Sequence, residues 1–212
     1  MPSITEVLSG VLRYFPNTMT MTLLVAGIML GKISWLLVAL GGLVLAIVVL
    51  VLQGLFQRGG VMFGQIPGAA VLEACSLLPI ATGSYSPVPS MWVSLTVYYG
   101  VYILMNAINI YQVTPNKMSK EAIPVQQRKG LGVISILASL ILLMFLLVPR
   151  WKTTCETKTG LITGILLGVG AAVGYWYVLD ACGADLYPDV HGVMLGLRPD
   201  FLKTHPVACT PP

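Results

Sequence analysis

Residues 20–56, TMTLLVAGIMLGKISWLLVALGGLVLAIVVLVLQGLF, decide the fold, and Lys32 is the only charged residue among them. A helix rises about 1.5 Å per residue and about 20 apolar residues cross the hydrocarbon core of a bilayer. The stretch is therefore too long for one crossing and suits two. Of the 212 residues, 56% are hydrophobic and 9% are charged, whereas about a quarter are charged in soluble domains. The sequence predicts an all-α integral membrane protein.

The N-terminal segment 1–56 is expected to form a transmembrane hairpin. Its first crossing is predicted at 11–30 or 15–30, with Pro16 in the first helical turn, and its second at 35–56. Gly31 is expected to cap the first helix and Ser34 to cap the second, because these residue types favour those positions. Residues 2–18 lack the order of a signal peptide, so we expect the first crossing to stay in the mature chain.

The rest of the chain divides by composition into three parts. Residues 57–90 are rich in Gly and Pro, and the piece 68–78 predicts an interfacial or partly re-entrant helix because it is too short to span. Residues 91–179 predict three more crossings, and residues 180–212 predict an irregular tail outside the membrane. The three crossings are expected at 91–111, 130–148 and 160–178, with a basic loop at 113–129 between the first two.

The expected number of membrane crossings depends on whether the first segment spans the membrane or lies in its surface. We expect a bundle of five transmembrane helices from segment length and turn chemistry. If the first segment only lies in the membrane surface, four crossings remain, and the excess of Lys and Arg on one side becomes larger. Either count places the basic loop 113–129 and the tail on the cytoplasmic side.

Glu73 is the only acid between Glu6 and Glu121, and it lies in an apolar run. An ionisable group at membrane depth predicts a proton or cation site. The alternative is an interfacial carboxylate that is hydrogen-bonded by the Ser and Tyr side chains of the following loop. The prolines that bracket the segment favour this second interpretation.

Polar side chains share one face of the predicted crossing 91–111: Tyr99, Tyr102, Asn106 and Asn109, with Tyr98 beside them. Such a stripe avoids lipid, so we expect it to turn into the bundle. It either forms hydrogen bonds between helices, which is the more frequent use of such residues, or lines a permeation path.

Small residues recur every four positions in the last predicted crossing, at Gly160, Gly164 and Gly168. Because glycine has no side chain, helix backbones can approach closely at these positions. The neighbour is either another helix of this chain or a second protomer, which would make a homo-oligomer.

The four cysteines divide into two pairs by crossing parity. Cys182 and Cys209 fall together in the tail, where they either form a disulfide or stay free thiols, depending on the compartment. The tail acids, with His191 and His205, lack the spacing of a metal site, and the sequence contains no catalytic motif. We therefore expect no cofactor, no metal and no enzymatic activity. The basic residues are too few and scattered to bind a nucleic acid.

Several pieces of the chain resemble small polytopic membrane proteins of large nucleocytoplasmic DNA viruses. They are the loop YSPVPS at 85–90, the link 150–155, the Gly-rich last helix, and the tail from DVHG at 189–192 to PVACTP at 206–211. The resemblance covers residues 73–212. It implies a virion inner membrane derived from host endoplasmic reticulum, with exposed segments that contact minor capsid proteins. Viral thiol oxidases would then favour the bridge between Cys182 and Cys209.

The sequence and this resemblance therefore predict a structural membrane protein that links a viral inner membrane to the capsid layer through its loops and tail. Its expected partners are the lipid bilayer, capsid proteins and other membrane proteins. The alternatives are a small transporter or channel subunit, in which Glu73 faces a water-filled path, and an accessory subunit of an organellar membrane complex.

Overall fold

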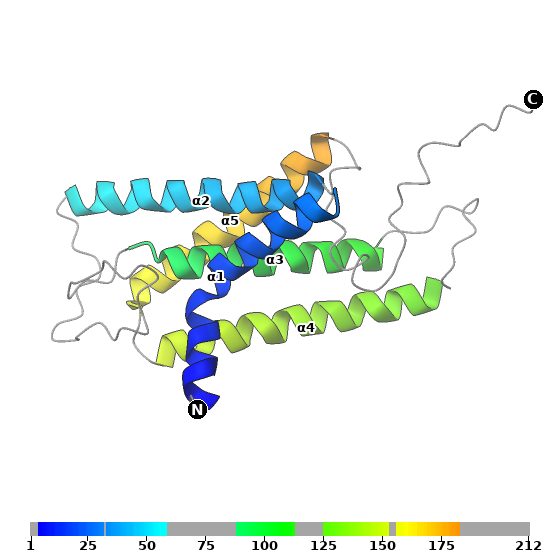
Figure 1. The fold of residues 1–212 in the computed structure, drawn as a ribbon, viewed down its shortest axis with the longest axis horizontal. Helices are drawn as coiled ribbons and strands as arrows, with labels where there is room; N and C mark the ends of the chain where they lie inside the picture. Colours follow the sequence, from blue (N-terminus) through cyan, green and yellow to red (C-terminus); the bar gives the residue numbers. More distant parts are fainter. Residues whose placement is uncertain (1–3, 32, 59–87, 113–124, 153–155, 183–212) are drawn as a thin grey trace, which may run out of the picture.

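Five α-helices make up the described part of the chain, and the described residues contain no strand (Figure 1). The computed structural model describes residues 4–31, 33–58, 88–112, 125–152 and 156–182, with side chains for 14–31, 33–56, 88–112, 129–152 and 156–182. The helices are α1 (Ile4–Met29), α2 (Ile33–Arg58), α3 (Met91–Gln112), α4 (Val125–Lys152) and α5 (Lys158–Cys182).

Four of these helices are long and apolar enough to cross a membrane. Their apolar spans are Ile33–Phe56, Met91–Gln112, Lys129–Lys152 and Lys158–Cys182. The all-α fold is therefore as predicted. The helix α1 is not among the four; its side chains are described only from residue 14, and the count of five or four crossings stays a prediction.

The first helix begins earlier than the predicted crossing. Pro16 is buried inside α1 and not in its first turn. Figure 1 shows that α1 changes direction along its length. Since proline removes a backbone donor and its ring crowds the preceding turn, we attribute this bend to Pro16. The expectation that Pro16 opens the first crossing was wrong, because the residues before it also form helix.

A tight turn joins α1 to α2. Gly31 has φ +61°, a left-handed conformation that favours glycine after a helix, as the sequence predicted. The helix α2 begins at Ile33, so Ser34 lies inside the helix and is not its N-cap. Nearby, Gly27 lies against Leu36, where an added Cβ would approach the Leu36 Cδ2 to 2.8 Å. The two helices are thus closely packed at the turn.

Two other helices extend beyond the predicted crossings. The helix α4 begins at Val125, inside the predicted loop 113–129, and continues through Pro149 to Lys152, although the crossing was expected at 130–148. The helix α5 continues past Asp180 to Cys182, so the tail does not begin at residue 180. The Ser90 side chain accepts a hydrogen bond from the Val93 amide at 3.3 Å and so caps the N-terminus of α3.

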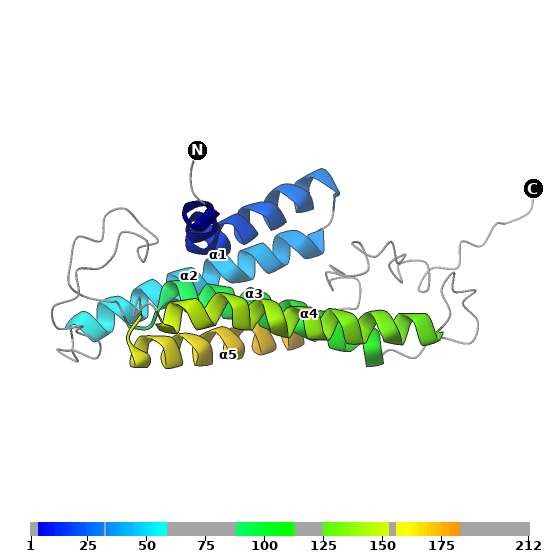
Figure 2. The same cartoon turned by 90° about the horizontal axis from the view of Figure 1, so that it is seen from below.

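The helix α3 is the centre of the bundle and packs against all four other helices. Of its most apolar 18-residue stretch, 61% is buried, against 22–33% in α2, α4 and α5. Figure 2 shows α4 and α5 alongside α3, with the α1–α2 hairpin on the other side. The largest side chains that are less than 2% exposed belong to α3: Trp92, Tyr98, Tyr99 and Tyr102.

Candidate functional site: the interhelical contacts of α3

Two adjacent glycines in α2, Gly41 and Gly42, leave space for tyrosine hydroxyl groups of neighbouring helices. Tyr98 of α3 donates a hydrogen bond to the Val38 carbonyl at 3.1 Å. Tyr175 of α5 donates one to the Leu37 carbonyl at 2.8 Å. A Cβ at Gly41 would overlap the Tyr98 hydroxyl and approach the Tyr175 ring. The missing side chain therefore lets hydroxyl groups from two helices reach the backbone of α2.

A second set of contacts, which involves Gly42 of α2 and Tyr99 of α3, connects α1 to α3. The Tyr99 hydroxyl lies 2.6 Å from the Thr20 hydroxyl, and Thr20 also donates to the Pro16 carbonyl at 2.8 Å. A Cβ at Gly42 would overlap the Tyr99 hydroxyl. Burying a polar group is costly unless it is hydrogen-bonded, and here the partners of Tyr98 and Tyr99 come from α2 and α1. The Tyr98 and Tyr99 rings pack edge to face at 5.1 Å.

The other members of the predicted stripe lie further along α3. Tyr102 and Asn106 are buried and Asn109 is half-buried. The Tyr102 ring lies 5.2 Å from the Trp176 ring of α5. The structure therefore brings Tyr98, Tyr99 and Tyr102 together in the interior, with Asn106 and Asn109 following on the same helix.

The predicted glycine series of α5 faces α3 of the same chain. Gly160, Gly164 and Gly168 are all buried. The Gly160 carbonyl accepts a hydrogen bond from the Ser90 amide at 3.2 Å. A Cβ at Gly168 would lie 2.6 Å from the Ser94 carbonyl oxygen and 2.8 Å from the Val97 Cβ. The α5 backbone therefore packs directly on α3, and no second protomer is needed to explain these three glycines.

Small residues also allow α4 to approach α3. A Cβ at Gly100 would overlap Leu143 of α4, and a Cβ at Gly132 would lie 3.1 Å from the Tyr111 Cβ. Ser135 and Ser139 are buried on α4, and the Ser139 hydroxyl donates to the Ser135 carbonyl at 2.7 Å. Glycine contacts thus occur at the interfaces of α3 with α2, α4 and α5.

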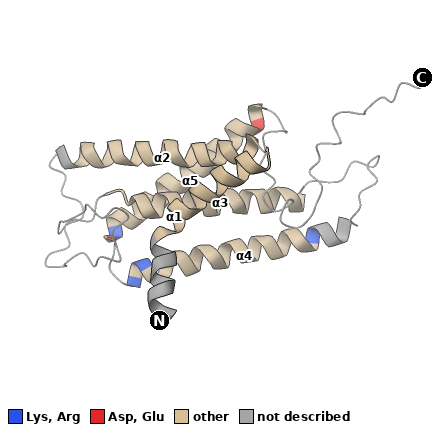
Figure 3. Ribbon diagram, viewed as in Figure 1, with Lys and Arg blue, Asp and Glu red and all other residues tan. Residues whose placement is uncertain are grey.

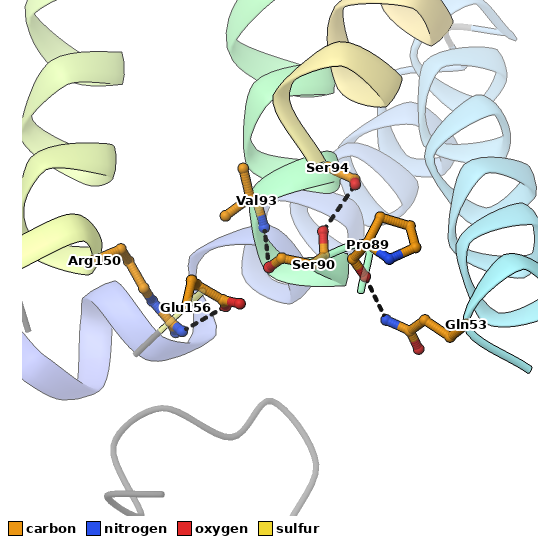
Figure 4. A network of polar contacts seen from close by, with 7 residues as sticks. All are labelled: Gln53, Pro89, Ser90, Val93, Ser94, Arg150 and Glu156. Carbon is orange, nitrogen blue, oxygen red and sulfur yellow. Dashed lines mark hydrogen bonds and ion pairs between the residues drawn. The ribbon is translucent and has the colours of Figure 1, made fainter. Parts of the chain in front are cut away.

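A polar cluster closes one end of the bundle (Figure 4). Arg150 of α4 pairs with Glu156 at 3.3 Å, and both side chains are 7% exposed. The Arg150 guanidinium also lies over the Trp92 ring, 4.3 Å from its centroid. Gln53 of α2 donates to the Pro89 carbonyl at 2.6 Å. The end of α4, the start of α3 and the end of α2 are therefore joined by polar contacts.

Charged side chains of the described residues lie only at or near helix ends (Figure 3). They are Lys129, Arg150, Lys152, Glu156, Lys158 and Asp180. Among the described side chains, no group of three or more His, Cys, Asp or Glu comes together. Between the helix ends, the described interior consists of apolar, aromatic and uncharged polar groups, which suits the hydrocarbon layer of a membrane.

Two features of this site were missed from the sequence. Gly41 and Gly42 lack the four-residue spacing that drew attention to α5, although a glycine pair inside a long apolar helix is itself a packing signal. The burial of Arg150 is the second feature: its side chain is buried against Glu156, while Trp151 and Lys152 at the same end of α4 are exposed.

Other predicted features fall outside the described residues. Glu73 and Cys209 lie there, as do most of the segment 57–90, the loop up to residue 124 and the tail from 183. Cys182 is exposed at the end of α5. Its pairing with Cys209 and the role of Glu73 therefore stay predictions.

No family model, curated protein or solved structure matches the chain. The class of protein therefore follows from the fold alone. The described residues form a helical bundle in which four helices are long and apolar enough to cross a membrane, and α3 lies at its centre.

Proposed function

We propose that the protein is a structural membrane component whose bundle anchors it in a bilayer and whose loop 113–124 and tail bind a protein layer beside the membrane. The observation that supports the proposal is that buried hydroxyl groups of α3 form hydrogen bonds to neighbouring helices. Tyr98 and Tyr99 bond to α2 and α1, where they hold helices together. Polar side chains committed to packing favour a static anchor over a conduction path.

The positions of the helix ends support the same proposal. Two of the described charges, Lys129 and Asp180, lie near the segments proposed to bind partners, whereas the other four lie around the α4–α5 connection, at the opposite ends of these two helices. A closely packed bundle fixes the helix ends from which those segments begin, which lowers the entropic cost of docking. The mechanism proposed is adhesion, without turnover of a substrate.

The finer proposal names the membrane and the partner. On the resemblance of residues 73–212 to viral membrane proteins, the membrane is the inner membrane of a large DNA virus. The layer beside it then consists of capsid proteins. This part depends on the sequence resemblance alone.

Deleting residues 185–212 tests the proposal. We expect the truncated chain to insert into membranes as the full chain does, because the four long helices are intact. Its association with capsid or other neighbouring proteins should be lost, as measured by chemical cross-linking in native membranes followed by mass spectrometry.

A matched control replaces the same residues with a Gly/Ser-rich segment of equal length, which preserves chain length and removes the specific side chains. This control should behave like the deletion. If either variant retains the cross-links of the full chain, the tail is not the binding segment.

A further inference from the structure

The helix α1 consists of two parts that run in different directions. Figures 1 and 2 both show its first part running across the long axis of the bundle, while its second part runs along the bundle towards the turn at Gly31. Phe15 packs on the cluster of Trp92, Val93, Val97 and Leu146. Thr20 lies beside Tyr99 further along α3. The change of direction thus occurs at the level of Trp92, near the start of α3.

The change of direction lies where the hydrocarbon core of the proposed membrane meets the headgroups. Trp92 is the second residue of α3, and the Arg150 guanidinium stacks on its ring. Trp151 and Lys152 follow at the end of α4, and both are exposed. Aromatic and basic side chains gather where hydrocarbon meets headgroups. A helix that crosses the bundle axis here lies in the plane of the membrane surface.

The sequence of the first part fits that position. Its apolar residues are spaced so that they share one face of an ideal helix: Ile4, Val7, Leu8, Val11, Leu12 and Phe15. Glu6 and Arg13 fall on the opposite face, with Ser9 near them. The helix α1 has the most one-sided apolar pattern of the five helices. Such a helix lies at the boundary between headgroups and acyl chains.

We propose that residues 4–15 form a surface-lying amphipathic helix that binds the lipid surface at the Arg150 end of the bundle. Pro16 separates this helix from the membrane-embedded second part of α1. Glu6 and Arg13 balance each other, so the attraction is apolar and does not depend on anionic headgroups. The inference concerns lipid contact and is independent of the proposed binding of a protein layer by the tail.

Two positions on opposite faces of the helix provide the test. In the full chain with its four cysteines replaced by serine, Val11→Cys and Ser9→Cys are each labelled with an environment-sensitive fluorophore and placed in phosphatidylcholine vesicles. We expect bromines near the headgroup end of the acyl chains to quench the label at position 11 several-fold more than the label at position 9. Aqueous iodide, present on both sides of the membrane, should show the reverse preference.

Any other pattern of quenching would contradict the inference. Iodide quenching of both labels would place residues 4–15 in water, and quenching of both by bromines at the acyl-chain ends would make them a membrane crossing. Protection of both labels from both quenchers would mean that protein covers the helix. Replacing part of the phosphatidylcholine with phosphatidylglycerol should leave the pattern unchanged, whereas a large change would contradict the apolar mode of binding.

Discussion

Replacing Gly168 with alanine is expected to lower the free energy of unfolding by about 1–2 kcal/mol. The new Cβ would lie 2.6 Å from the Ser94 carbonyl oxygen and 2.8 Å from the Val97 Cβ. One of these is a backbone atom, so the overlap is relieved only if α5 moves away from α3. Overpacking of this kind costs about 1–3 kcal/mol, from which the better helix propensity of alanine recovers part. Steric trapping in bicelles measures the change.

Gly170→Ala is the matched control, because Gly170 lies on the same helix, is exposed, and an added Cβ there would meet no atom of another helix within 4 Å. The same chemical change should there be neutral or stabilising by up to about 1 kcal/mol. Equal effects at the two positions would mean that α5 does not pack on α3 through this face.

Arg150→Met is expected to destabilise the bundle by about 3 kcal/mol. Arg150 and Glu156 are both 7% exposed, so removing the arginine leaves a buried carboxylate without its partner. Loss of one member of a buried ion pair costs about 3–5 kcal/mol, and the guanidinium also stacks on Trp92. The same unfolding measurement applies, at a pH near neutrality where both groups are charged.

Two variants separate the ion pair from the loss of a surface charge. Lys152→Met removes an exposed charge two residues away and should change the free energy of unfolding by less than about 0.5 kcal/mol. The double variant Arg150→Met/Glu156→Met should be less destabilised than Arg150→Met alone, since no uncompensated charge remains. A double variant as unstable as the sum of the two single variants would contradict a direct interaction.

The helices themselves are largely predictable from the sequence. Long apolar runs with almost no charge identify α2 to α5, since only a helix satisfies every backbone group within lipid. The turn at Gly31 and the cap at Ser90 follow from local chemistry that involves only neighbouring residues. The four-residue spacing of Gly160, Gly164 and Gly168 indicates a packing face for the same reason.

The partners of each face are not predictable in the same way. Periodicity places Tyr98 and Tyr99 on α3, but which helix receives their hydroxyl groups depends on how segments 60 and 79 residues apart align. The reason for glycine at positions 41 and 42 becomes apparent only when the positions of those tyrosine hydroxyl groups are known. The direction change in α1 was missed because a proline was expected only at the start of a helix.

The membrane crossing of α4 is the most direct test of the account. Its span Lys129–Lys152 has 24 residues, about 34 Å at the rise of a helix, and the hydrocarbon core is about 30 Å thick. In the cysteine-free chain in sealed, uniformly oriented vesicles, Lys129→Cys and Lys152→Cys are treated with a membrane-impermeant maleimide. We expect one position to react from outside and the other only after permeabilisation. Reaction of both positions from the same side would contradict a bundle that spans the membrane.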